Sequence, residues 1–216
     1  MPTTTTFYSG PGDGQVNYLG AGGGTWATTH NAANGTANGI SADEYLMARY
    51  FSTVYTVYRM FQIVDTSALP DDAVISSATV GFWGLGSGGT DPRHYNIYSS
   101  TAGDTLANSD YQSCGTTAFS DTSVAHSAWT TGSYNTWAMN ATGIAAISKT
   151  GKTKFSIREA DKDVANTAPA VDVNNYVHGQ TSAYTGATRD PYLSVTYTVV
   201  KRRGPGGGVA YGGMGY

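Results

Sequence analysis

The chain contains little charge and almost no cysteine. Only 12% of its 216 residues are Asp, Glu, Lys or Arg, and 12 basic against 15 acidic residues leave a net charge of −3. A net negative charge gives no indication of the basic surface that a nucleic-acid-binding protein needs. No segment approaches the roughly 18 consecutive apolar residues of a membrane helix. We therefore expect neither nucleic acid nor membrane among the partners, and Cys114, the single cysteine, excludes an internal disulfide.

The residues that dominate instead are glycine, threonine and aromatic residues, with 28 Gly, 16 Tyr and 4 Trp. Hydrophobic residues make up 40% of the chain, which together with the small net charge is unlike a disordered protein. Thr and Tyr favour strands, whereas a helical bundle would be rich in Ala, Glu, Lys and Leu. The length suits one domain with a sizeable core. The composition therefore predicts a single all-β domain.

Runs of β-branched and aromatic residues predict the strands. The clearest run, Val54–Val64, is apolar on both faces, which indicates a central strand buried on both sides. In the closing run the apolar residues alternate, so one of its faces can meet solvent. The remaining runs are shorter. Besides Val54–Val64, the predicted strands are Val74–Trp83, Tyr95–Tyr98, Lys154–Arg158 and Tyr192–Val200.

One short helix and several long loops complete the predicted fold. The spacing of Ile144 and Ile147, with capping residues at each end, predicts a helix over Asn140–Lys149. Polar, glycine-rich stretches between the strands predict surface loops, which often carry interactions. These stretches are Gly20–Gly39, Gly84–Asp91 and Asn174–Arg189. The expected architecture is a β-sandwich.

The last sixteen residues differ from the rest, because they combine seven glycines with three basic residues and no periodicity. We divide the chain into an N-terminal segment (1–15), a sandwich domain (16–200) and a glycine-rich basic arm (201–216). Composition alone is typical of a flexible tail; the alternative is an arm that contacts a neighbouring subunit. The arm residues assigned to assembly are Lys201, Arg202, Arg203, Tyr211 and Tyr216.

Several short elements of the chain occur in the order found in a known family. Within Tyr58–Pro70 an Arg-bearing strand ends in the turn Asp65-Thr66-Ser67, Ala73–Val80 follows, and Phe155–Glu159 and Asp190–Tyr197 come later. Together they resemble the DNRLRE-like domains, over about residues 16–198, although Val64 stands where the family has Phe. The resemblance implies a jelly-roll β-sandwich related to carbohydrate-binding modules. Such domains accompany extracellular enzymes or occur in phage structural proteins.

No residue pattern predicts an enzyme. Gly84–Gly89 fits a dinucleotide-binding glycine motif, but turn residues follow it where a helix must begin. Cys114 has no base nearby in sequence, and the four histidines are scattered without metal-ligand spacing. The few acidic residues lie mostly in expected turns, which disfavours a glycosidase pair. We therefore expect no catalytic residues, no cofactor and no zinc.

Acidic residues offer one possible metal site and one ion pair. Asp71 with Asp72, or Glu159 with Asp161 and Asp163, could bind calcium, although ordinary turn aspartates explain them as well. Arg59 lies within the most apolar strand, where a buried charge needs a partner. By analogy with the family, Glu159 is the predicted partner.

The four tryptophans carry the main functional alternatives. Trp83 ends the predicted strand Val74–Trp83, and both Trp83 and Trp137 are expected to pack in the core. Trp26 and Trp129 lie in polar, threonine-rich loops, so they are the candidates for exposed aromatic contacts. Exposed aromatic rings can stack on sugars or anchor contacts between subunits.

Together these features predict a non-enzymatic structural protein of a viral (phage) particle, such as a head decoration, fibre or tail-associated sandwich. It would contact copies of itself and other virion proteins, and would be made in the host cytoplasm, because Met1–Thr6 begins no secretory signal. The alternative is a carbohydrate-binding module of an extracellular or cell-surface protein, which would bind glycans. A small hydrolase is the third and weakest hypothesis.

Overall fold

The computed structural model describes residues 1–39, 41–170, 174–184 and 187–199. Within them, thirteen strands form one continuous antiparallel network, and the protein is an all-β sandwich. The strands are β1 (Thr3–Tyr8), β2 (Gly14–Leu19), β3 (Ala37–Gly39), β4 (Asp43–Phe51), β5 (Val54–Asp65), β6 (Ala73–Gly88), β7 (His94–Ser100), β8 (Cys114–Ala118), β9 (Val124–Ala125), β10 (Tyr134–Ala138), β11 (Lys152–Glu159), β12 (Tyr176–Gln180) and β13 (Tyr192–Val199).

The helices are all short, and none of those described has the length and apolar character needed to cross a membrane. Two are α-helices, α1 (Trp26–His30) and α2 (Ala141–Ala145). The others are the 3₁₀ turns η1 (Asn108–Gln112), η2 (His126–Ala128) and η4 (Ala187–Arg189), and the π-helix η3 (Ala160–Val164).

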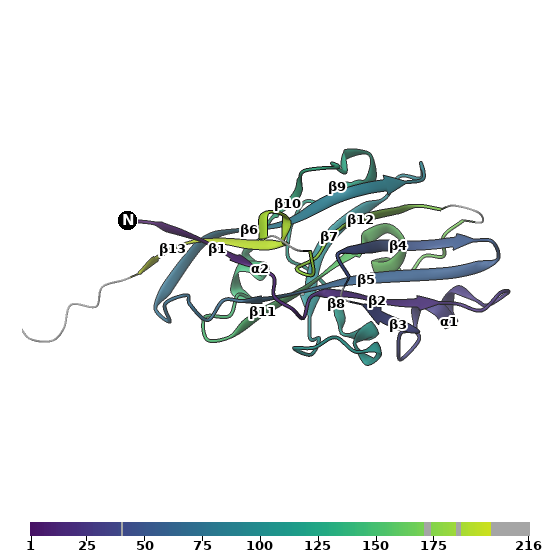
Figure 1. Ribbon diagram of the computed structural model, residues 1–216, viewed down its shortest axis with the longest axis horizontal. Helices are drawn as coiled ribbons and strands as arrows, with labels where there is room; N and C mark the ends of the chain where they lie inside the picture. Colours follow the sequence, from purple (N-terminus) through teal and green to yellow (C-terminus); the bar gives the residue numbers. More distant parts are fainter. Residues whose placement is uncertain (40, 171–173, 185–186, 200–216) are drawn as a thin grey trace, which may run out of the picture.

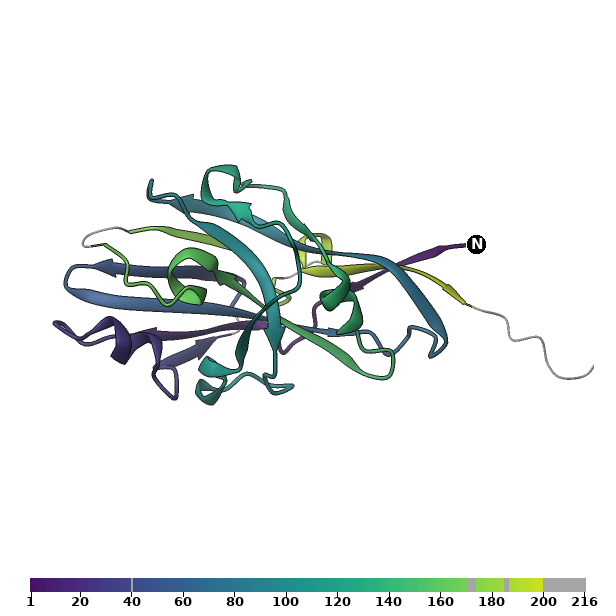
Figure 2. The same ribbon diagram turned by 180° about the vertical axis from the view of Figure 1, so that it is seen from behind.

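Two long strands hold the layers together. The first part of β5, residues 54–58, pairs with β4, and its second part, residues 60–65, pairs with β11. β5 therefore joins two different strands along one of its edges. β6 likewise pairs with β13 over residues 73–81 and with β12 over residues 84–88. At one end of the molecule, β1 and β13 run side by side towards a tapered tip, as both views show (Figures 1 and 2).

The predicted central strand is confirmed. β5 covers the whole of Val54–Val64, and most of its side chains are buried. Its β-branched and aromatic residues pack into two hydrophobic clusters of the interior. The largest fully buried apolar side chains of the core are Trp137, Tyr95, Tyr111, Phe61, Phe82 and Phe155.

The structure corrects two of the expected loops and the extent of the helix. Residues 84–88 belong to β6, and residues 176–180 of the third expected loop form β12. The first expected loop contains α1. The helix predicted over residues 140–149 is shorter in the structure, where α2 ends at Ala145. Asn140 caps its start by accepting a hydrogen bond from the backbone N–H of Gly143. Residues 3–8, assigned to the N-terminal segment, form β1. The arm lies outside the described residues.

Candidate functional site

Aromatic side chains gather on the outer face of three neighbouring strands. Tyr45 on β4 lies opposite His178 on β12, and Met47 on β4 lies opposite Tyr58 on β5. Alternate residues of these strands, such as Leu46 and Val57, are fully buried beneath them. We use the name "aromatic face" for the half-buried rings and the two neighbouring side chains on β4: Tyr45, Tyr58, Tyr176, His178, Met47 and Arg49.

Tyr45 is the centre of the aromatic face. Its ring stacks parallel to that of His178, with 5.0 Å between the ring centroids. The rings of Tyr176 and Tyr58 stand edge-on to it, at 5.4 Å and 6.3 Å. Such arrangements are the favourable geometries for aromatic pairs. The four rings therefore brace one another and present a fixed, partly exposed surface.

Two glycines of β6 allow the rings of β12 to lie down on the sheet. Gly86 is opposite His178 and Gly88 is opposite Tyr176. A Cβ atom at Gly86 would lie 2.5 Å from Nε2 of His178, and one at Gly88 would lie 2.5 Å from Cε1 of Tyr176. The glycine repeat that resembles a nucleotide motif therefore leaves room for the aromatic rings of β12 to lie against β6. We call Gly86 and Gly88 the glycine floor.

A shallow cavity of about 260 Å³ opens on the aromatic face, and every residue of that face except His178 lines it. Its volume lies just below the range of roughly 300–1,000 Å³ in which pockets enclose a drug-sized ligand. It therefore suits one ring of a longer molecule lying across the face. Burial and the nearby Asp43 carboxylate raise the pKa of Tyr45, so its phenol is neutral and can donate a hydrogen bond.

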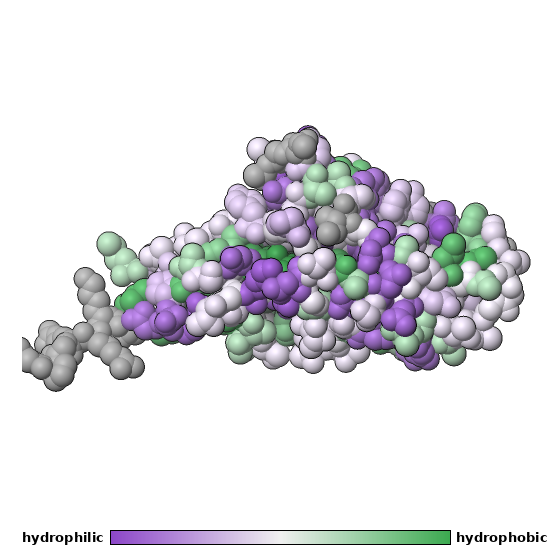
Figure 3. All heavy atoms as spheres, turned by 60° about the horizontal axis from the view of Figure 1, so that its bottom comes forward, coloured by the Kyte–Doolittle hydropathy of each residue, from purple (hydrophilic) through white to green (hydrophobic). Residues whose placement is uncertain are grey.

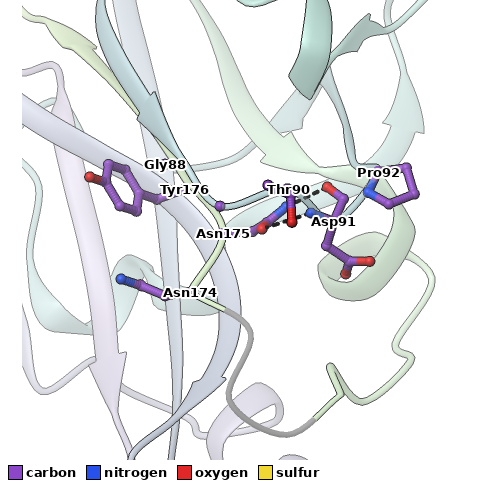
Figure 4. A pocket seen from close by; sticks show the side chains of 8 residues that line it. Gly88, Thr90, Asp91, Pro92, Asn174, Asn175 and Tyr176 are labelled. Carbon is purple, nitrogen blue, oxygen red and sulfur yellow. Dashed lines mark hydrogen bonds between the residues drawn. The ribbon is translucent and has the colours of Figure 1, made fainter.

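A second pocket, of about 540 Å³, lies at the ends of β6 and β12 and shares Tyr176 with the first (Figure 4). Figure 4 shows Tyr176 and Asn174 pointing to one side and Asn175 to the other. The Asn175 side chain accepts a hydrogen bond from the backbone N–H of Asp91 and donates one to its carbonyl. This amide therefore joins the two strand ends.

A second row of aromatic residues crosses β10, β6 and β13. The ring of Tyr134 lies edge-on to Trp83 at 5.1 Å and to Tyr192 at 4.8 Å. The guanidinium of Arg189 lies 5.3 Å from the Trp83 ring, and the Tyr134 hydroxyl donates to the backbone of the same loop. These contacts tie the row to the residues that lead into β13.

The two tryptophans predicted to be exposed are buried, with 9% of Trp26 and 7% of Trp129 accessible. Trp26 belongs to α1, and its indole N–H donates to Asn166 Oδ1 at 2.9 Å. Trp129 packs against Phe82, Tyr95 and Trp137 in the main core. Their polar sequence neighbours gave no sign of this, because the loops fold back over the sandwich. The core prediction for Trp137 is confirmed, and Trp83 is half-buried.

The predicted Arg59–Glu159 pair is also corrected. Nη2 of Arg59 lies 2.7 Å from Oδ1 of Asp163, and Arg158 binds the same carboxylate through Nε at 2.8 Å. Glu159 is bound instead by Arg93, at 3.3 Å. Arg59 and Glu159 lie in different strands, and the π-helix η3, which carries Asp163, returns the chain beneath Arg59. The need of Arg59 for a buried partner was predictable, but the identity of that partner was not.

The carboxylates of Glu159, Asp161 and Asp163, named above as a possible calcium site, are engaged by hydrogen bonds and ion pairs within the protein. Glu159 accepts hydrogen bonds from the backbone N–H groups of Asp161, Lys162 and Asp163 at the start of η3. Burial raises the pKa of Glu159 to about 7. Asp161 accepts from the backbone N–H of His94. Within the described residues, which include Asp71 and Asp72, no group of three or more His, Cys, Asp or Glu side chains is arranged to hold a metal.

Cys114 is buried, and burial raises the pKa of its thiol. Its Sγ donates to the carbonyl of Tyr111, and the buried charges of Arg59, Arg158 and Asp163 all influence its pKa. No histidine is hydrogen-bonded to it within the described part of the chain. A buried thiol held in its neutral form is a poor nucleophile.

No protein-family model matches the chain, and no curated protein matches its sequence. The resemblance to the DNRLRE-like domains therefore stays a prediction. The site is defined by its own geometry, which is a set of braced tyrosine rings around a shallow cavity on the outer face of a β-sandwich.

Proposed function

We propose that the protein is a non-enzymatic binding module that holds carbohydrate on its aromatic face. The observation that supports this is the group of four braced rings around a cavity of about 260 Å³. Sugar rings have apolar C–H faces that pack on aromatic rings, and the hydroxyls around them bond to polar tips such as phenols. Such a module would function at a cell surface or outside the cell.

Binding to a glycan array tests this proposal. Tyr45→Ala removes the central ring, and we expect it to reduce affinity about tenfold, because one aromatic contact contributes roughly 0.5–1.5 kcal/mol beyond its buried area. Tyr8→Ala is the matched control, since Tyr8 is 50% exposed on β1, outside the aromatic face. Absence of binding to every glycan, or equal binding by both variants, contradicts the proposal.

A second candidate function, assembly into a viral (phage) particle, is favoured by the edge strand β1. β1 stands at the end of the strand order, and β13 is its only neighbour among the described strands. Thr3–Tyr8 contains no charged residue. Natural edge strands are usually protected by charge, proline or a covering element. Exposed apolar residues lie at the same end of the molecule, and Figure 3 shows green, hydrophobic atoms at that tapered end. They are Met1, Val74 and Val199.

On this second proposal, β1 would pair with a neighbouring copy and the arm would contribute further contacts. Light scattering of the full chain over a concentration range tests it. The double variant Thr4→Lys and Thr6→Lys places charge along the edge and is expected to give monomers, whereas removal of residues 201–216 separates the contribution of the arm. A full chain that is monomeric at every concentration contradicts assembly and leaves the carbohydrate proposal intact.

A further inference from the structure

The second pocket adjoins the aromatic face, and the two cavities share one wall. Tyr176 lines both of them. Asn174 lines the second pocket and accepts a hydrogen bond from Arg49, which lines the cavity on the aromatic face. A ligand that lies on the aromatic face can therefore continue past Tyr176 into the second pocket.

Together the two cavities extend over four neighbouring strands. Tyr58 lies on β5, Tyr45 on β4 and Tyr176 on β12, and Gly88 lies opposite Tyr176 on β6. Neighbouring strands are about 4.8 Å apart, so this span is roughly 14 Å and is longer than a single sugar ring. The second pocket alone, with a volume of about 540 Å³, lies within the range of roughly 300–1,000 Å³ that is usual for ligand pockets. The surface therefore has room for a chain of sugar units.

A carboxylate stands across the second pocket from the shared wall. Figure 4 shows Asp91 and Tyr176 at opposite sides of this pocket. Oδ2 of Asp91 accepts a hydrogen bond from Nε of Arg93 at 2.9 Å, and the buried Arg93 is itself anchored by Glu159. This bond does not use Oδ1, and the Asp91 side chain is 35% exposed. A carboxylate that is already held in place accepts hydrogen bonds from a ligand at little further cost in side-chain freedom.

The other polar groups of the pocket supply donors. Arg49 can only donate, so the oxygen of the Asn174 amide faces it, and the N–H groups of that amide remain for other partners. Thr90, which is exposed, and Tyr176 contribute hydroxyls. Neighbouring hydroxyls of a sugar ring match this set, because each of them donates one hydrogen bond and accepts others. Asp91 would repel an acidic unit, so the pocket suits a neutral sugar.

We propose that the second pocket binds the neutral sugar units that follow the one held by Tyr45, so that the protein recognises neutral oligosaccharides of about three units or more. This inference rests on the proposed carbohydrate-binding function and specifies its ligand class. A monosaccharide or disaccharide would occupy the aromatic face alone and would bind more weakly.

Calorimetric titration of the full chain with gluco-, xylo- and manno-oligosaccharides, from the monosaccharide to the hexasaccharide, tests the proposal. For at least one series we expect the affinity to rise about tenfold or more between the disaccharide and the tetrasaccharide, since hydrogen bonds to a charged group contribute roughly 1.5–3 kcal/mol. Beyond the tetrasaccharide the affinity should level off, because further units extend past both cavities.

Two substitutions in the second pocket separate its contribution from that of the aromatic face. Asp91→Asn removes the charge and keeps the shape, and Thr90→Val removes only a hydroxyl. Each is expected to lower the affinity for the tetrasaccharide about threefold or more and to leave that for the disaccharide unchanged, whereas Tyr45→Ala weakens both. Asp71→Asn is the matched control, because Asp71 is an exposed aspartate outside both cavities. The melting temperature reports folding, and the exposed Thr90 keeps the test valid if Asp91→Asn loses stability.

The inference and the proposed function fail in distinguishable ways. Equal affinity for all chain lengths, or unchanged tetrasaccharide binding in both variants, overturns the inference. Tighter binding by Asp91→Asn also overturns it, because this result would show that the ligand is acidic. If Tyr45→Ala still weakens glycan binding in any of these cases, the carbohydrate-binding function stands. If no glycan binds, both are wrong.

Discussion

Replacing Asp163 by Asn should destabilise the protein more than almost any other single change of charge. The carboxylate is 1% exposed and accepts hydrogen bonds from Arg59 and Arg158. Nε2 of His30 lies 3.3 Å from the same carboxylate. In Asp163→Asn, two buried guanidinium groups would remain without a compensating charge. Removing one partner of a buried ion pair costs about 3–5 kcal/mol, which for a chain of this length is a fall of about 6–20 °C in melting temperature.

The pH dependence separates the charge effect from a simple loss of packing. Burial alone would raise the pKa of Asp163, but Arg59 and Arg158 outweigh it and hold that pKa well below its usual range. A depressed pKa gives stability that is complete above the unfolded value of about 3.9 and is lost as pH falls through the folded value. The advantage of the natural protein over Asp163→Asn should therefore be full at pH 6 and shrink below about pH 4.

Urea unfolding at several pH values measures both quantities. Asp161→Asn is the matched control on the same π-helix, because the Asp161 side chain is 39% exposed and pairs with the exposed His94. We expect that control to change stability by about 1 kcal/mol or less. A loss below 1 kcal/mol in Asp163→Asn, or a loss that stays constant from pH 6 to pH 3, would refute the charge argument.

Three further predictions concern the glycine floor, a buried acid and the thiol. Gly88→Ala should displace the Tyr176 ring and reduce glycan affinity about tenfold. The melting temperature should change by less than about 4 °C, because the half-exposed ring can rotate away. Unchanged glycan binding in calorimetry would contradict the role of the glycine floor. Burial raises the pKa of Glu44 to about 7, so the natural protein should lose stability as pH rises from about 4.5 to 7, and Glu44→Gln should remove that part of the decline in urea unfolding. The Cys114 thiol should resist iodoacetamide in the native protein and react once urea unfolds the chain, as mass spectrometry would detect.

Strand positions were largely predictable where apolar runs are long. Val54–Val64 lies within β5, and Lys154–Arg158 lies within β11, because continuous β-branched and aromatic residues leave few other structures possible. Short polar strands such as β1, which is mostly threonine, carry no apolar pattern and were not predicted. Residues 84–88 of β6 were not predicted as strand, because a glycine-rich sequence resembles a loop. The glycines are needed there because the rings of Tyr176 and His178 on β12 pack against them.

The candidate site was beyond the reach of local patterns. Aromatic contacts were expected, but they were assigned to Trp26 and Trp129, because a tryptophan among polar residues resembles a surface residue. The aromatic face instead combines residues more than a hundred positions apart, such as Tyr45 and His178, through the pairing of β4 with β12. Strand register decides which rings share a face, and register depends on the whole sheet.

The position of Tyr58 next to Arg59 links the aromatic face to the buried charges. Consecutive residues of a strand point to opposite faces, so Tyr58 lies on the aromatic face while Arg59 is anchored below by Asp163 and by the carbonyl of Tyr111. The Tyr58 ring thus stands on a backbone that is anchored from below. On the proposed function, glycan binding would cost little ordering of the protein, and a change deep in the interior would weaken it without altering a residue of the aromatic face.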